Sequence, residues 1–128
     1  MNRILFIFLF LTFSSFVFQM YGDGVMPNQI HIEQRPNGGT HSGQPLFPAD
    51  QPDVYYNDVT QVIIIDGTGY STYYNVEITS LSTFYVMIST SVNGNYDTID
   101  VSSLPDDNYE IILTSSYNNV FEGYFTNY

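Results

Sequence analysis

The fold of this chain is decided by Ser103-Leu104-Pro105-Asp106-Asp107-Asn108-Tyr109-Glu110-Ile111-Ile112-Leu113. An apolar Leu is followed by a polar turn that opens with Pro, and a Tyr then begins an apolar strand. In a sandwich of two β-sheets such a turn joins the sheets, and the Tyr hydroxyl bonds to the backbone a few residues upstream. We therefore expect Leu104, Pro105 and Tyr109 to form a structural corner.

Further strands are predicted on both sides of this corner by short runs of β-branched and aromatic residues between turn residues. Asn93-Gly94 predicts a type I′ hairpin, because both residues tolerate a positive φ. Asn57-Asp58 and Asn118-Asn119 predict two more tight turns, and such links are too short for helical crossovers. The pattern predicts an all-β, seven-stranded antiparallel sandwich of the immunoglobulin-like type. The expected strands cover residues 53–57, 59–66, 73–81, 84–92, 96–102, 109–115 and 120–127.

Apolar residues that alternate along these strands are the expected core. Residues 62–65 are apolar at every position, which is typical of a central strand covered on both faces. The core candidates are Val62, Ile64, Val76, Ile78, Val86, Ile88, Ile99, Val101, Leu104, Ile111, Leu113, Phe121 and Phe125.

The first residues predict an export signal. Met1-Asn2-Arg3 gives a charged start, and residues 4–18 are nearly all apolar. That run is interrupted by Thr12 and two Ser, and it is shorter than the ~20 residues that a membrane-spanning helix needs. We expect residues 1–24 to be a signal peptide and the mature protein to be secreted or periplasmic. Because the chain has no Cys, it cannot begin as an acylated lipoprotein.

Residues 25–52 are rich in Pro, Gly, Asn and Gln, which predicts an extended tail or linker ahead of a sandwich domain at 53–128. A short strand is expected near residues 30–33, where Ile-His-Ile-Glu alternates. This strand could complete the sheet of another subunit, pair with its own sandwich or stay loose.

The charge is strongly acidic, with a formal net charge of −11 and no Lys. Once a signal containing Arg3 is removed, Arg35 is the only Lys or Arg left. Such a surface repels phosphate backbones and anionic head groups. We expect no nucleic-acid partner and no membrane insertion after signal removal.

From about Pro52 onward the chain resembles a family of unassigned function, made of small exported immunoglobulin-like proteins of gut Bacteroidetes. Family members usually have Gly where this chain has Asp107, and Asp tolerates a left-handed backbone better than most residues. The resemblance implies a fold and an exported location but no mechanism. The Leu-Pro-x-x-x-Tyr pattern is also similar to the C-terminal sorting domains of a Bacteroidetes secretion system, which implies an export-sorting role as an alternative. The resemblance is carried by residues 76–78, 99–105, 109–113 and 123–125.

Catalytic and metal-binding patterns are weak. His31 and His41 lie in the tail, away from any nucleophile and without further metal ligands at suitable spacing. We therefore expect no catalytic residue, no metal site and no cofactor. Four acids near one end of the strands could offer oxygen to Ca²⁺ but are more typical of turns: Asp97, Asp100, Asp106 and Asp107.

Tyr is abundant, with 12 in the chain. Exposed Tyr rings stack on sugars or anchor protein interfaces, and Tyr70, Tyr73 and Tyr74 are the candidate ligand-binding residues. The sequence favours a non-catalytic binding or structural accessory module of the cell envelope, a monomer or weak oligomer that recognises glycan or protein. The alternatives are an export-sorting or strand-addition module and, more remotely, a carboxylate-dependent hydrolase. Binding requires an exposed aromatic surface, assembly an unpaired sheet edge, and hydrolysis facing carboxylates in a cavity.

Overall fold

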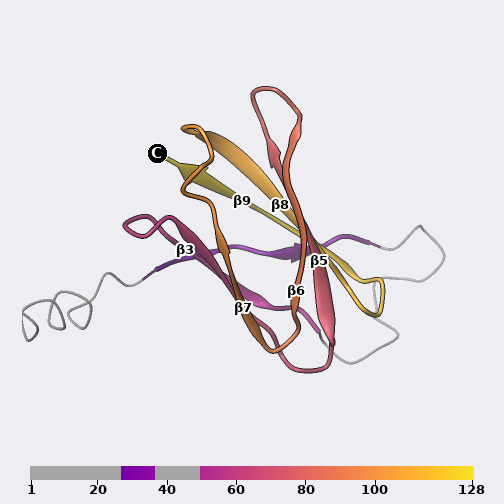
Figure 1. The fold of residues 1–128 in the computed structure, drawn as a ribbon. Coiled ribbons are helices and arrows are strands. Elements are labelled where there is room, and N and C mark those ends of the chain that lie inside the picture. The colour runs from indigo at the N-terminus through magenta and orange to yellow at the C-terminus, as the bar shows by residue number, and fades with distance from the viewer. Residues whose placement is uncertain (1–26, 37–49) are drawn as a thin grey trace, which may run out of the picture.

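A computed structural model describes residues 27–36 and 50–128, which form nine strands in two antiparallel sheets (Figure 1). The four-stranded sheet has the order β1-β3-β4-β7, and the five-stranded sheet has the order β2-β9-β8-β5-β6. The predicted all-β sandwich is confirmed. The strands are β1 (Asn28–Ile30), β2 (Glu33–Gln34), β3 (Asp53–Asn57), β4 (Val62–Asp66), β5 (Tyr73–Ser80), β6 (Val86–Asn93), β7 (Tyr96–Asp100), β8 (Asp107–Ser115) and β9 (Val120–Asn127).

The seven expected strands correspond to β3 through β9. The two additional strands come from residues 27–36, which the sequence places in the extended tail. β1 pairs with β3 in one sheet, and β2 pairs with β9 in the other. Between them the chain crosses from sheet to sheet, and Ile30 at the end of β1 and Ile32 in the crossing are both buried. The predicted signal peptide at 1–24 lies outside the described residues. Within the described part, no helix is long and apolar enough to span a bilayer.

The core fills the space between the sheets, and its main contributors alternate along β5, β8 and β9 as predicted. In β4, however, Ile63 and Ile65 are buried, whereas Val62 and Ile64 were expected in the core. Four successive apolar residues show no alternation that would predict which face of the strand is buried. The buried face is set by pairing with β3, because the inward-facing Val54 of β3 stands opposite Ile65.

The expected burial of Val86 and Ile88 is also corrected. Val86 is exposed, and Ile88 is only partly buried. Ile78 of β5 stands opposite Ile88, but the next residue of β5 stands opposite Val86. Met87 is therefore an extra residue in β6, and such a bulge interrupts the alternation of faces. In Figure 1 the β5–β6 hairpin projects from the top of the molecule.

The corner expected at residues 104–109 is built around fully buried Tyr109. Its hydroxyl donates to the Pro105 carbonyl at 2.5 Å, and its ring stacks on Phe125 with centroids 5.4 Å apart. Asn127 lies beside this contact, where its amide donates to the Leu104 carbonyl at 3.1 Å and its side-chain oxygen accepts from Tyr56 at 2.5 Å. These bonds fasten the last strand to the turn that joins the sheets.

The Asn93-Gly94 hairpin prediction is wrong, because β6 and β7 belong to different sheets and do not pair. Neither residue has a positive φ. Gly94 instead lies against the backbone of Ser71, where an added Cβ would stand 1.7 Å from the carbonyl oxygen. Glycine is required there for close approach and not for a turn. The turn predicted at Asn118 does form, with φ at 64°.

Candidate functional site

Three of the four acidic residues considered for calcium binding, namely Asp97, Asp100 and Asp107, accept hydrogen bonds from neighbouring turns. Asp97 accepts the amide hydrogen of Asn93 at 2.9 Å, and Asp100 accepts that of Ser102 at 2.9 Å. In the part of the chain that the structure covers, no three His, Cys, Asp or Glu side chains are grouped so as to hold a metal ion. His31 is exposed at the bend between β1 and β2, with its Nε2 3.1 Å from Glu33. His41 lies outside the described residues.

Asp107, the first residue of β8, stabilises the structure through hydrogen bonds. Its carboxylate accepts hydrogen bonds from the hydroxyls of Ser80 and Ser82, and these bonds lower the pKa of the carboxyl group. The expectation of a left-handed backbone at this position is wrong, because its φ is not positive. An ionised Asp that is held by two Ser hydroxyls stabilises the turn of the β5–β6 hairpin and is unsuited to act as a general acid.

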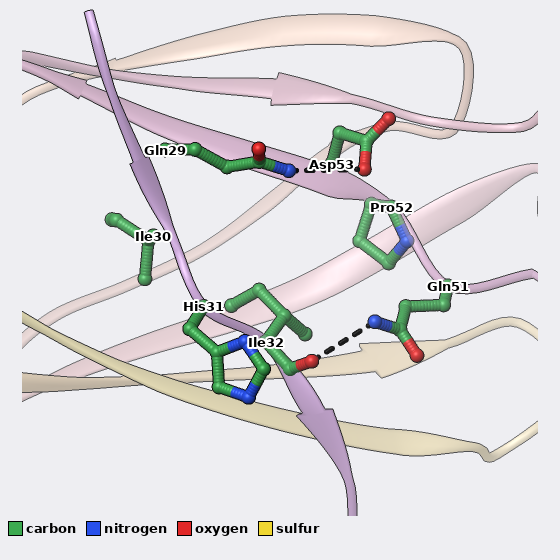
Figure 2. Close-up of a pocket in the computed structure, with 7 residues that line it drawn as sticks. All are labelled: Gln29, Ile30, His31, Ile32, Gln51, Pro52 and Asp53. Carbon is green, nitrogen blue, oxygen red and sulfur yellow. Dashed lines mark hydrogen bonds between the residues drawn. The ribbon is translucent and has the colours of Figure 1, made fainter.

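Two shallow cavities flank β1. The first, with a volume of about 300 Å³, lies between the β1–β2 bend and the start of β3. Figure 2 shows its polar groups turned toward one another: Gln51 donates to the Ile32 carbonyl at 2.9 Å, and Gln29 reaches Asp53 at 3.5 Å. The second, of about 330 Å³, includes Asp58 and two exposed Tyr. Each cavity is lined by one carboxylate, whereas glycoside hydrolysis uses a pair.

The three Tyr predicted to bind ligand are separated by the fold. Tyr70 is 56% exposed and Tyr73 is 43% exposed, but Tyr74 is 0% exposed. The Tyr74 hydroxyl donates to the Asp50 carbonyl at 2.5 Å, and burial raises the pKa of Tyr74 to about 12. Tyr74 is therefore a core residue and offers no ring to a ligand. Neighbouring residues of a strand face opposite sides of the sheet, so Tyr73 and Tyr74 could not both have been exposed on one face.

Tyr70 and Tyr73 belong to a group of connections at one end of the sandwich, here called the tyrosine loops: residues 67–73, 94–96 and 116–119. The first connection is joined to the second by two backbone hydrogen bonds, from Gly67 to Asn95 at 2.8 Å and from Gly94 to Thr72 at 3.0 Å. These bonds require the glycines, because a Cβ on Gly67 would stand 1.7 Å from the Gly94 oxygen.

Serine hydroxyls join the first connection to the third. The side-chain oxygens of Ser71 and Ser116 lie 3.0 Å apart, and each also bonds to the backbone amide of the other's connection. The backbone amide of Ser116 further donates to Tyr73 at 3.2 Å. Three connections from distant parts of the chain are thereby fixed as one surface.

Four Tyr side chains are exposed on the tyrosine loops, namely Tyr70, Tyr73, Tyr96 and Tyr117. Tyr96 was not among the expected ligand-binding residues. It begins β7 directly after the connection through Gly94 and Asn95, and it stands opposite Asp66 at the end of β4. Its position at a strand end next to turn residues was the available signal.

Comparison with solved structures supports the fold. The chain is similar to the crystal structure of a DUF3244 family protein from Bacteroides vulgatus ATCC 8482, which has an immunoglobulin-like β-sandwich fold. The two are 15% identical, the match covers 80% of this chain and 100% of that one, and the TM-score is 0.62. This agrees with the resemblance to an immunoglobulin-like Bacteroidetes family of unassigned function. No family model and no curated protein matches the chain.

Proposed function

We propose that the protein is a non-catalytic binding module of the cell envelope that recognises its ligand with the tyrosine loops. The observation that carries this proposal is the exposure of Tyr rings on connections that are bonded to one another. A Tyr ring presents a large contact area with few rotatable bonds. Because the backbone beneath these rings is already ordered, binding them costs little additional conformational entropy.

The ligand class that fits best is a neutral glycan. Sugar rings have apolar faces that stack on Tyr, and their hydroxyls bond to amide and hydroxyl side chains. Thr68, Thr72 and Asn95 supply such groups at exposed positions on the same connections. A polyanionic ligand is disfavoured by the net charge of −11. A protein surface of the envelope is the second ligand class.

Location in the envelope rests on the sequence, through the charged start and apolar run of residues 1–18. The expected result is a shortened protein in the periplasm or the medium. Fractionation of cells and N-terminal sequencing of the purified protein test it, and an uncleaved chain in the cytoplasm would contradict it.

Binding is tested by screening the purified protein on an array of neutral and charged glycans. The double variant Tyr70→Ala/Tyr73→Ala removes two exposed rings. We expect it to bind at least about tenfold more weakly, a loss of about 1.4 kcal/mol. Tyr128→Ala is the matched control, because Tyr128 is exposed at the far end of β9 and its backbone contact to Gln61 survives the change. Equal binding by both variants would contradict the proposed site.

A further inference from the structure

The edges of the two sheets are protected unequally. An unpaired edge can recruit another strand, and proteins guard edges by shortness, charge, Pro or bulges. β1 and β2 have only three and two residues, and β7 carries Asp97 and Asp100 within five residues. β6 is an edge of eight residues with neither charge nor Pro of its own. Among the described residues, it is protected by the bulge at Met87 and, at its last residue, by Asp97, which accepts the Asn93 amide hydrogen.

The absence of charged residues in β6 extends to the segments on both sides of it. From residue 78 to residue 96 the chain has no Asp, Glu, Lys or Arg, although its formal net charge is −11. The middle of β6, at Ser89, Thr90 and Ser91, is exposed. β6 is therefore the place where an equally acidic body can approach with the least repulsion.

The end of the β5–β6 hairpin adds apolar surface beside this edge. Phe84 is 77% exposed, and its φ of 62° is an unusual backbone conformation for a bulky residue. The tip is held by hydrogen bonds from Phe84 to Ser80 at 2.8 Å and from Ser80 to Tyr85 at 3.0 Å. The large apolar side chains that are exposed here are Leu81, Phe84, Tyr85, Val86 and Met87.

We propose that β6 pairs with β6 of a second copy of this chain, antiparallel and about a two-fold axis, so that two five-stranded sheets become one. A two-fold axis places the same edge against itself, so an uncharged edge on one copy meets an uncharged edge on the other. With Thr90 at the axis, the start of β6, with its exposed Val86 and Met87, lies against the end of the partner's β6, and the hairpin tip extends past that end. The exposed apolar side chains at this contact lose contact with water. The other three edges are too short or too acidic to pair in this way.

This inference is independent of the proposed function, because it uses the edge of the five-stranded sheet and not the tyrosine loops. It is tested by sedimentation of the purified protein over a range of concentrations. We expect a monomer and a dimer in reversible exchange, with more dimer at about 0.1 M salt than at about 0.01 M, because salt screens the repulsion between two acidic copies. A monomer at every concentration and both salt levels would overturn the proposal.

The sharpest variant is Thr90→Glu, which places a carboxylate in the middle of β6 and so brings two carboxylates together across the axis. We expect the dissociation constant to rise at least about tenfold. Thr98→Glu is the matched control, an exposed Thr in the middle of the other long edge, β7. Equal effects of the two variants would overturn the assignment of the dimer to β6. Unchanged circular dichroism and melting temperature would show that both variants fold.

A second variant, Phe84→Gly, tests the hairpin tip without threatening the fold. Glycine accepts the positive φ at no steric cost, so we expect an equal or higher melting temperature together with weaker dimerisation. Dimerisation of full strength would overturn the role of the tip. The test also distinguishes a different partner at this edge. If the protein is monomeric and an envelope protein binds to it but not to Thr90→Glu, β6 binds that protein. The proposal of a second copy is then overturned.

Discussion

The two ends of the sandwich use tyrosine in opposite ways. At the corner, Tyr56 and Tyr109 are buried, and their hydroxyls bond to Asn127 and Pro105. At the tyrosine loops, backbone bonds, two glycines and a pair of serines hold the chain, and rings such as Tyr70 remain exposed. Where aromatic hydroxyls hold the structure together, the rings are unavailable to a ligand. Where small residues do so, the rings are exposed at the surface.

The largest effect is expected from Asn127→Ala at the corner. Asn127 is fully buried, and its loss leaves the Tyr56 hydroxyl and the carbonyls of Val101 and Leu104 without this partner. We expect the free energy of unfolding in urea to fall by roughly 3 kcal/mol. Thr126→Ser, at the neighbouring position, is the control, because it keeps the hydroxyl that donates to Asn108. It should change the free energy of unfolding by less than about 0.5 kcal/mol. A small effect of Asn127→Ala would show that polar contacts do not hold the corner.

A smaller effect is expected from Gly94→Ala at the other end. The added methyl group would overlap the backbone of Ser71, so the connections must move apart. We expect a loss of about 2 kcal/mol in urea unfolding, together with weaker binding of any ligand that the tyrosine loops hold. Asn95→Ala is the control for the unfolding measurement alone, because this side chain is exposed and is one of the groups proposed to bind ligand. Full stability in Gly94→Ala would mean that the loops are not fixed by close backbone contact.

Tyr109→Phe should have a more modest effect. It keeps the ring and its stacking on Phe125 but removes the hydrogen bond to the Pro105 carbonyl. We expect a loss of about 1 kcal/mol in the same unfolding measurement. Tyr128→Phe removes a hydroxyl from an exposed ring and serves as the control. Equal stabilities of the two variants would show that the hydrogen bond from Tyr109 to Pro105 does not stabilise the corner.

The last effect is expected in alkali and concerns the ionisation of Tyr74. Burial raises the pKa of Tyr74 from 10.0 to about 12, with a further contribution from the charge of Asp50. The folded protein therefore holds a proton that the unfolded chain releases above about pH 10. Its contribution to stability is complete below pH 10 and is lost as the pH rises toward 12.

Urea unfolding at several pH values, with phenolate absorbance recorded alongside, measures this contribution. We expect the free energy of unfolding to fall less steeply with rising pH in Tyr74→Phe than in the unaltered protein. We also expect one fewer Tyr in the variant to ionise at the high-pH end of the titration. Burial also raises the pKa of Tyr56 and Tyr109, so some decline remains in the variant. The same slope in both proteins would contradict the assignment of Tyr74 to the core.

The sequence predicted the layered fold because the corner and the alternating strands are local patterns. β1 and β2 are too short, at three and two residues, to show an alternation of their own. The sequence does not show which side chains of β4 face the core, because the run is apolar at every position. The pairing of β4 with β3 decides which of them are buried. Asn93-Gly94 has the local preference for a hairpin, but the passage from one sheet to the other overrides it.

The candidate site was predictable in composition but not in geometry. Tyr70 and Tyr73 could be chosen because Tyr is frequent near turns, whereas the assignment of Tyr74 failed on a face that only the strand pairing reveals. The contact between Gly67 and Gly94 joins residues far apart in the sequence, and no local sequence pattern predicts it. Tyr96 acquires its place on this surface through that contact and through the pairing of β7 with β4.

The pairing of β2 with β9 links the beginning of the described chain to its end. Glu33 stands opposite Glu122, and Arg35 bonds to the same Glu122 at 2.7 Å. During synthesis the ribosome makes β2 before β9. The five-stranded sheet therefore cannot close until β9 has been made, and β2 stays without its partner strand until then.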